Sequence, residues 1–347
     1  MYLKSPDFRC SATRGHAPGL DATATRPGVP AHPASGRAPR HRSPDVRYNR
    51  PIEPFTDRLA AECERKGAAV CVGIDPVLER LPGGLADDGA PLDRIVCFVE
   101  QVLEAVADHV PCVKFQSACF ERYRAEGVAA YDHLVACAHE HGLLVIGDVK
   151  RGDIGASAGH YAAANLDDEV SEPGAVADAI TINGWCGADG VEPFIHDAAR
   201  GGRGLFVWVR ASNPSSDAFQ ALRLEDGRTV SEAMAGIVAG LGEAEALRGA
   251  CGYSLLGAVV GATKPSEAVQ LRKLMPRQWF LVPGFGAQGG GAEDVRACFN
   301  DDGRGALITA SRSILYAYEK QDGDWRRAVA GAATAFRDQI RGIVGDG

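Results

Sequence analysis

The chain lacks the cysteine spacings that mark disulfide-rich domains and zinc sites. Its ten cysteines are scattered over 347 residues, and no two of them form a C-x-x-C pair. Several lie inside apolar runs, which favours reduced, buried thiols in a cytosolic protein over a disulfide framework. The imidazoles of His139-Glu140-His141 would face different ways on a helix, so this triplet does not predict a zinc site. We therefore expect no bound metal and a cytoplasmic location.

The chain also lacks long apolar runs and an excess of positive charge. No window reaches the roughly 18 uninterrupted apolar residues of a membrane span, and the N-terminus has no apolar stretch of a secretory signal. The formal net charge is −8, whereas a protein that tracks phosphate backbones is normally basic. These absences argue against membrane and nucleic-acid partners and favour a small-molecule ligand.

Residues 1–50 differ from the remainder of the chain in composition. They contain seven prolines and nine basic against three acidic residues, so their formal charge is +6 against −14 for residues 51–347. The prolines would interrupt the amphipathic helix of a transit peptide. We predict a disordered, dispensable basic extension over residues 1–50, followed by one folded domain over residues 51–347; a transit peptide or a basic tether is the alternative.

From residue 55 onward, short apolar runs rich in Val and Ile alternate with segments of helical period. Eight such runs are predicted to be strands, over residues 68–75, 110–116, 143–150, 178–183, 204–212, 255–262, 279–285 and 305–311. Helical patterns lie between or after them, for example over residues 92–106, 230–247, 266–274 and 325–344. Eight strand–helix repeats predict an α/β fold of the (β/α)8 TIM-barrel type, with an open doubly wound sheet as the alternative.

Polar side chains gather where the predicted strands end. The residues at or just past these ends include Asp75, Lys114, Asp148, Lys150, Asn183, Ser212, Pro283 and Arg312. A TIM barrel collects its catalytic groups at the carboxyl ends of its strands, while the strand interiors stay apolar. The distribution therefore favours the closed barrel and predicts one active-site mouth.

The most concentrated charge lies at the end of the third predicted strand. Strand alternation places Asp148 and Lys150 on one face, about 6.6 Å apart along the strand, and Asp153 follows in the loop. A pair of opposite charges at a strand end is ordinarily a structural salt bridge. Because other strands also end in charged residues, and a water-poor mouth penalises unpaired charge, we interpret the group as catalytic.

The segment from Asp148 to Ile154 resembles the D-x-K-x-x-D-I signature of the orotidine 5'-phosphate decarboxylase family. Further segments resemble family motifs in chain order, over residues 73–76, 113–116, 211–214, 260–263, 282–290 and 311–314. The D-x-K-R-G-D-I and S-N-P forms are similar to those of the bacterial type 2 branch. The resemblance implies a cofactor-free carboxy-lyase that converts orotidine 5'-monophosphate to uridine 5'-monophosphate and CO2 in pyrimidine biosynthesis.

The resemblance also implies roles for the charged residues. Lys150 would stabilise a carbanion-like transition state and deliver a proton to C6 of the pyrimidine. Asp148, Lys114 and Asp153 would complete an alternating charge network around the substrate carboxylate. Asp153 and Ile154 would reach into the site of a neighbouring subunit, which implies a homodimer.

A second group of residues is expected to surround the nucleotide. The implied substrate-binding residues are Asp75, Ile154, Ser157, Ser212, Pro283, Gln288, Gly289, Gly290 and Arg312. Gln288, the glycines that follow it and Arg312 would hold the phosphate, in line with the phosphate sites of barrels beside strands seven and eight. Ser212 would read the pyrimidine edge, and Asp75 with Lys114 would bind the ribose hydroxyls.

The sequence departs from the family pattern at two positions. Phe115 stands where relatives often carry proline, and it is expected to alter local packing. Ser157 stands where threonine is common, but it keeps a hydroxyl that could contact a ribose oxygen. The match after the fourth strand, over residues 181–184, is weak, and we assign it no role.

Two alternatives to the decarboxylase follow from the same scaffold. A magnesium-dependent sugar-phosphate decarboxylase or aldolase would carry a metal-binding glutamate where this chain has Lys114, and a second cation beside an ammonium is unfavourable. A catalytically silent nucleotide-binding barrel would be expected to have lost Lys150 or Asp148. Because Lys114, Asp148 and Lys150 are all present, the decarboxylase is favoured.

Overall fold

The computed structural model describes residues 52–83, 85, 89–169, 171, 174–262, 264–285 and 291–345, without the side chains of residues 292 and 293. Ile52–Gly347 forms one unit of the chain. The extension predicted over residues 1–50 lies outside the described residues.

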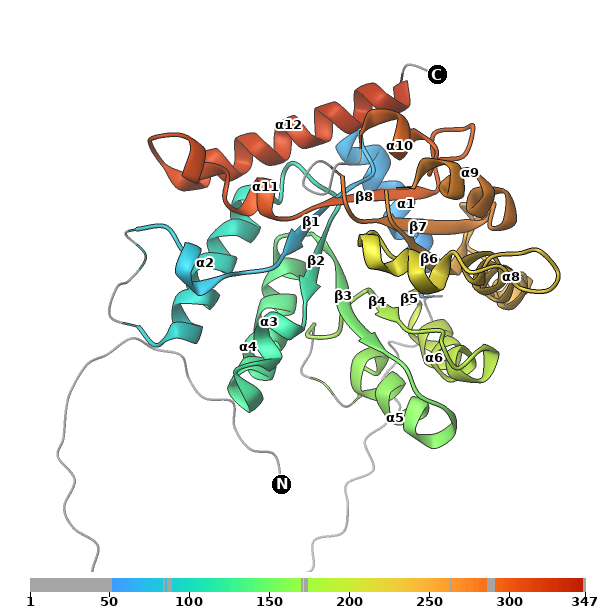
Figure 1. Cartoon of the computed structure of the whole chain (residues 1–347). Coiled ribbons are helices and arrows are strands. Elements are labelled where there is room, and N and C mark those ends of the chain that lie inside the picture. The colour runs from blue at the N-terminus through green and yellow to red at the C-terminus, as the bar shows by residue number, and fades with distance from the viewer. Residues whose placement is uncertain are drawn as a thin grey trace, which may run out of the picture. The chain divides into compact units, whose positions relative to one another are not determined.

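All eight predicted strands are present. They are β1 Val70–Ile74, β2 Cys112–Gln116, β3 Leu144–Arg151, β4 Ala179–Ile182, β5 Gly204–Arg210, β6 Ser254–Val260, β7 Gln278–Val282 and β8 Ala306–Ala310. Each strand pairs in parallel with the next, and β1 pairs with β8, so the sheet closes on itself (Figure 1). The predicted TIM barrel is confirmed, and the open doubly wound sheet is excluded.

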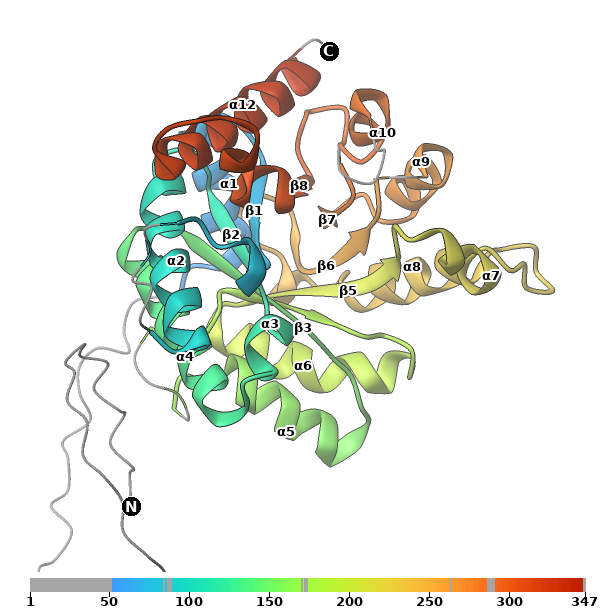
Figure 2. The ribbon, with the colours of Figure 1, turned by 60° about the vertical axis from the view of Figure 1, so that its left-hand side comes forward.

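The helices lie around the outside of the barrel, as the two views in Figures 1 and 2 show. The α-helices are α1 Phe55–Lys66, α2 Pro91–Val106, α3 Ala118–Glu121, α4 Arg124–Glu140, α5 Gly155–Leu166, α6 Ala188–Gly201, α7 Asp217–Gln220, α8 Val230–Leu241, α9 Pro265–Leu274, α10 Ala292–Arg296, α11 Arg312–Leu315 and α12 Trp325–Gly345. Short 3-10 turns cover Leu78–Arg80, Pro214–Ser216, Glu245–Leu247 and Ala317–Lys320. Within the described residues, no helix is both long and apolar enough to cross a membrane.

Two buried apolar clusters hold these layers together. The larger one joins the outward faces of the strands to the helices and includes Ile180 and Ile182 of β4. The smaller one fills the barrel interior and includes Ala179 and Ile146, with Phe55 and Leu59 of α1 packed into it. Burial of each such large side chain stabilises the fold by about 1.5–3 kcal/mol. Helix α1 therefore closes the amino end of the barrel and leaves the carboxyl end open.

The ends of two elements differ from the sequence prediction for local reasons. The fifth strand was expected to run to residue 212 but ends at Arg210, because the Ala211 amide donates to Gln220 Oε1 at 2.9 Å instead of continuing the ladder. The helix expected over residues 230–247 begins with a Thr229–Glu232 capping box and ends at Leu241, before Gly242. The remainder of that segment forms the separate turn Glu245–Leu247.

Candidate active site

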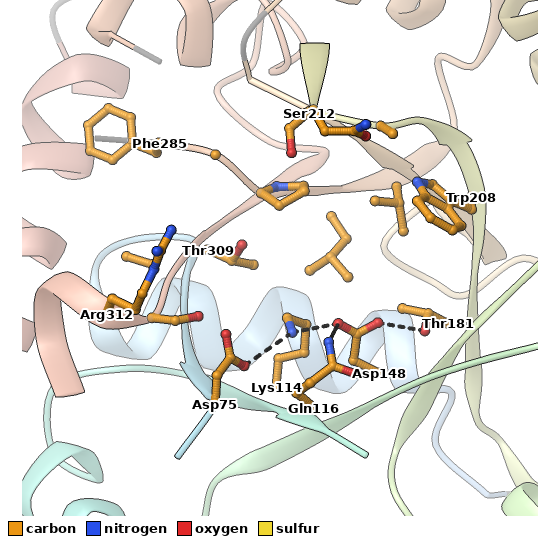
Figure 3. Close-up of a pocket in the computed structure, with 18 of the residues that line it drawn as sticks. Asp75, Lys114, Gln116, Asp148, Thr181, Trp208, Ser212, Phe285, Thr309 and Arg312 are labelled. Atoms are coloured by element: carbon orange, nitrogen blue, oxygen red, sulfur yellow. Dashed lines mark hydrogen bonds and ion pairs between the residues drawn. The ribbon is translucent and has the colours of Figure 1, made fainter. Parts of the chain in front are cut away.

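The polar strand ends predicted from the sequence, except Asn183, meet in one cavity of about 260 Å³ at the carboxyl end of the barrel. Its walls are Asp75, Lys114, Gln116, Asp148, Lys150, Thr181, Trp208, Ala211, Ser212, Asn213, Val259, Leu281, Pro283, Gly284, Phe285, Thr309, Ala310, Ser311, Arg312 and Ser313. Figure 3 shows that the carboxylate and ammonium groups of β2 and β3 form the floor of this cavity, with Arg312 and Ser212 placed around its rim. The single mouth predicted from the strand ends is therefore present.

A chain of ionic contacts runs across the cavity floor. Lys114 Nζ lies 2.7 Å from Asp148 Oδ2, and Lys150 Nζ lies 2.6 Å from Asp148 Oδ1. Asp75 Oδ1 lies 3.9 Å from Lys114 Nζ on the other side. The carboxylate of Asp148 is thus shared between two ammonium groups.

The network stabilises its own ionised state. Burial alone would raise the pKa of Asp148, but the charges of Lys114 and Lys150 and their hydrogen bonds lower it to about 2. Burial would lower the pKa of Lys114, but the charges of Asp148 and Asp75 outweigh that effect and raise it. Asp148 and Lys114 are therefore both charged at neutral pH, and charges of opposite sign alternate along the cavity floor.

The backbone around Lys150 is unusual for a strand. Lys150 has a φ of +47°, in the left-handed region that a non-glycine residue enters at a cost. The β3–β4 register also shifts between Gly147 and Arg151. These deviations bring the Lys150 ammonium 6.0 Å from the ring centroid of Trp208 on β5, so the cation lies against an aromatic wall.

Three lining residues with direct contacts to this network were not predicted as site residues. Gln116 Nε2 donates to Asp148 Oδ2 at 3.0 Å, and Thr181 Oγ1 donates to Asp148 Oδ1 at 2.8 Å. Trp208 forms the wall beside Lys150. Strand alternation could have identified Thr181, because it is two residues from the interior residue Ala179 and so shares its inward face.

The side of the cavity expected to bind the nucleotide is only partly described. Ser212, Pro283 and Arg312 all line it, whereas Gln288, Gly289 and Gly290 lie outside the described residues. Asp75 Oδ1 is buried and accepts no hydrogen bond from the described residues. An acceptor in that state at a cavity wall is available to a ligand hydroxyl.

A close approach between β1 and the start of α11 shapes this side. An added Cβ on Gly73 would lie 1.9 Å from Ser311 Oγ, a distance that no side chain can tolerate. Glycine in the first motif therefore lets Ser311, and Arg312 after it, approach Asp75.

Three of the residues predicted for the site do not line the cavity of this chain. The Asp153 carboxylate accepts a hydrogen bond from the backbone amide of the next residue in the same chain, Ile154, at 2.8 Å. The side chain of Ile154 is 56% exposed, and Ser157 is exposed as well. Within one chain, the ionic contacts on the cavity floor therefore join Lys114, Asp148 and Lys150 but not Asp153.

Phe115, the residue that replaces the usual proline, lies on the outward face of β2. It is fully buried, and its ring packs against Phe120 and Tyr131 with centroid separations of 6.2 and 5.9 Å. It therefore supports the strand that carries Lys114 from behind.

The comparisons with known proteins agree with this geometry. The family model of orotidine 5'-phosphate decarboxylase / HUMPS matches residues 69–324. The orotidine 5'-phosphate decarboxylase of Rhodopirellula baltica is 38% identical over 305 residues, covering 83% of this chain and 99% of the relative. The corresponding protein of Clostridium novyi is 37% identical over 77% of this chain and 90% of its own length.

A solved structure gives the same result for the fold. A crystal structure from Streptomyces avermitilis, described as a candidate orotidine 5'-phosphate decarboxylase, superposes with a TM-score of 0.71 at 35% identity. The match covers 85% of this chain and 97% of that one. The resemblance seen in the motifs is therefore confirmed, and the chain belongs to the orotidine 5'-phosphate decarboxylase / HUMPS family.

Proposed function

We propose that the chain removes CO2 from orotidine 5'-monophosphate to give uridine 5'-monophosphate, with Lys150 as the group that stabilises and protonates C6. The observation that carries this proposal is the ionised Lys114–Asp148–Lys150 array on the cavity floor. Family membership supports the reaction, and the array supports the assignment of roles to residues.

The chemistry of the substrate explains why such an array is useful. Loss of CO2 from C6 leaves an electron pair in the plane of the pyrimidine, orthogonal to the π system and without a resonance sink. A fixed ammonium next to C6 stabilises this developing charge, because it needs no reorganisation when the bond breaks. Lys150 then transfers a proton to C6 and becomes neutral, which completes the replacement of carboxylate by hydrogen.

Asp148 positions both ammonium groups for this step. Its two oxygens bind one lysine each, so Lys150 is held by Oδ1 while Lys114 is held by Oδ2. Its negative charge, with that of Asp75, also raises the pKa of the buried Lys114 ammonium and keeps it charged. We infer that Lys114 and Asp75 bind ribose hydroxyls from the same floor, because Asp75 Oδ1 has an unused acceptor position.

The opposite rim fits the phosphate and the base. We assign Arg312 to the phosphate, together with Gln288, Gly289 and Gly290, because an exposed guanidinium at a cavity rim provides a forked donor for phosphate oxygens. Ser212 is assigned to the pyrimidine edge, and Pro283 to the wall beside it.

We further propose that the working unit is a homodimer in which Asp153, Ile154 and Ser157 complete the neighbour's site. All three residues lie outside this chain's own cavity, and the side chain of Ile154 is 56% exposed. Two aromatic residues, Trp185 and Phe219, are also 66% and 40% exposed, and their rings contact each other at a tilt of 59° with a centroid separation of 4.8 Å. Exposed apolar side chains of this size are suited to a subunit interface.

The sugar-phosphate alternative finds less support in the geometry. Its metal would need an acidic ligand at the second strand, where Lys114 instead contacts both Asp148 and Asp75. Among the residues that the structure describes, no group of three or more His, Cys, Asp or Glu side chains is arranged to hold a metal ion.

A single assay tests the proposal against both alternatives. The full-length protein is incubated with orotidine 5'-monophosphate, with and without EDTA, and uridine 5'-monophosphate is followed by chromatography. We expect product at the same rate in both samples. A rate abolished by EDTA would favour the magnesium-dependent alternative, and absence of product with tight nucleotide binding would favour the silent barrel.

Two finer expectations need separate measurements. Sedimentation of the protein across a concentration series would test the homodimer, and a monomer with full activity would contradict it. The cytoplasmic location predicted from the sequence stays a prediction, which cell fractionation would test.

A further inference from the structure

The β3–β4 pairing is interrupted where the two principal charged residues of β3 lie. Gly147 is paired with Ile180 and Arg151 with Ile182, so three residues of β3 face the single residue Thr181 of β4. This bulge contains Asp148 and Lys150. Regular ladder hydrogen bonds cannot hold a bulged segment, so another group must fix its conformation.

The side chain of Thr181 contacts both charged residues of the bulge. The Lys150 backbone amide donates to Thr181 Oγ1 at 3.0 Å, and Thr181 Oγ1 donates to Asp148 Oδ1 at 2.8 Å. Thr181 is only 2% exposed, so water does not compete for its hydroxyl. Figure 3 shows the Thr181 side chain next to the Asp148 carboxylate, on the side away from Lys114.

The direction of both hydrogen bonds follows from elementary chemistry. A backbone N–H can only donate, so the Thr181 oxygen must accept from Lys150. The Asp148 carboxylate is ionised and can only accept, so the single hydroxyl proton of Thr181 must point toward it. The hydroxyl is therefore fixed in one orientation and cannot be replaced by a group that only accepts or only donates.

We propose that Thr181 is a positioning residue that holds Asp148 Oδ1 and the Lys150 backbone in register, so that the Lys150 ammonium is directed at the reacting carbon. This inference rests on the proposed function of Lys150. Lys150 needs such a restraint, because its φ of +47° is unfavourable for a lysine and the β3–β4 register is interrupted around it. Asp148 Oδ1 also accepts a hydrogen bond from the Lys150 ammonium. The Thr181 hydroxyl therefore binds the Lys150 backbone amide directly and the Lys150 ammonium through Asp148.

The test compares variants that separate the hydroxyl from the shape of the side chain. Thr181→Val keeps the β-branched shape and removes the hydroxyl, whereas Thr181→Ser keeps the hydroxyl and removes a methyl group. Thr56→Val is the matched control, because Thr56 is also buried but lies in α1 at the closed end of the barrel. For each protein we would measure kcat and KM with orotidine 5'-monophosphate, the Kd of uridine 5'-monophosphate and the thermal midpoint.

We expect Thr181→Val to lower kcat by about 100-fold, the scale of a misplacement of about 1 Å in an active site. Its KM and its Kd for the product should change by less than about threefold, because Thr181 acts through Asp148 and Lys150. Thr181→Ser should recover kcat to within about fivefold of the wild type, and Thr56→Val should match the wild type. This split between kcat and KM, with recovery by serine, would not arise from loss of stability alone.

Two results would overturn the inference. One is a kcat of Thr181→Val within about threefold of the wild type, and the other is an equal loss in Thr181→Ser and Thr181→Val. If Thr181→Val does not fold, Thr181→Ala replaces it, with the same criteria. Wild-type protein that forms no uridine 5'-monophosphate would instead contradict the proposed function, so the two failures are distinguishable.

Discussion

The two ends of the barrel use the same kinds of charged residue for opposite purposes. At the amino end, Asp178 accepts hydrogen bonds from His139 and from the Val145 amide, at 2.9 and 2.8 Å, and pairs with Arg58. At the carboxyl end, Asp75 keeps a buried oxygen without a hydrogen bond from the described residues. The hydrogen-bonded carboxylate of Asp178 stabilises the fold, whereas the Asp75 oxygen is available to a ligand.

Arg272 extends this contrast. It is 7% exposed and donates to four backbone carbonyls, those of Cys298, Met275, Gln278 and Gly305. Burial lowers its pKa to about 10, and the charge is stabilised by these carbonyl dipoles and by the Phe280 ring, whose centroid lies 3.5 Å from the Arg272 Cζ. Lys150, by contrast, is 38% exposed at its side chain and has a strained backbone, as expected for a group placed for chemistry and not for stability.

The largest effect should come from Lys150→Ala at the open end. We expect kcat to fall by about 10⁴-fold, the upper range for loss of a general acid, while the free energy of unfolding changes by less than about 1 kcal/mol. Lys273→Ala, an exposed lysine on α9, serves as the control. Turnover of Lys150→Ala within about tenfold of the wild type would contradict the proposed role.

The reverse pattern is expected for Arg272→Met at the closed end. The variant removes four hydrogen bonds to buried carbonyls, of which those of Gly305 and Met275 keep a backbone amide donor, so the free energy of unfolding should fall by about 3–5 kcal/mol in urea denaturation. At a temperature where the variant stays folded, kcat should equal that of the wild type. A large loss of kcat without loss of stability would show that the amino end takes part in catalysis.

The closed end should also make stability depend on pH. Burial alone would lower the pKa of His139, but its hydrogen bond and attraction to Asp178 raise it. Its contribution to stability is then complete below the unfolded value of about 6.5 and is lost as the pH rises through the raised folded pKa. The difference in free energy of unfolding between the wild type and His139→Gln should therefore decrease as the pH rises above about 6.5.

Asp178 should give the opposite dependence at acid pH. Burial would raise its pKa, but the bond from His139 and the charges of Arg58 and His139 lower it to about 2. Its contribution is complete above the unfolded value of about 3.9 and is lost as the pH falls toward 2, with a size of about 2–3 kcal/mol. Urea denaturation of Asp178→Asn across this range measures it, and a wild type and variant with parallel profiles would contradict the assignment.

The smallest effect is expected for Asp75→Asn at the open end. Asp75 Oδ1 accepts no hydrogen bond from the described residues and lies 3.9 Å from Lys114 Nζ, so loss of its charge should lower the free energy of unfolding by at most about 1 kcal/mol. The KM for orotidine 5'-monophosphate should rise by about tenfold, which corresponds to about 1.4 kcal/mol of lost ribose binding. Asp301→Asn is an exposed control, and an unchanged KM for Asp75→Asn would remove Asp75 from the ribose site.

Strand positions and charged strand ends were predictable because they depend on local patterns. Runs such as residues 143–150 and 305–311 gave β3 and β8 to within a residue at each end. The strand ends carrying Lys114, Asp148 and Arg312 then converged, because parallel strands in a barrel present their carboxyl ends at one mouth. Helix 230–247 was overextended because Gly242 ends it through a local backbone change that the apolar period does not report.

The partners of the charged residues were not predictable from those patterns. The weak motif after the fourth strand gave no role to Thr181, yet the bulge in β3 places its hydroxyl between Asp148 and Lys150. His139, considered in the sequence only as a metal ligand, is a half-buried partner of Asp178, which lies 39 residues further along the chain and just before β4. Such contacts depend on which side chains face each other across elements, and a single sequence does not contain that information.

The sequence by itself determined the eight-stranded barrel, its charged mouth and its family, because alternating hydrophobicity and short motifs act over a few residues. Only the tertiary structure decided which buried polar groups have hydrogen-bond partners and which remain available to a ligand. The physical reason is that hydrogen bonds and ion pairs require approach to about 3 Å between elements distant in the chain, which packing alone brings about.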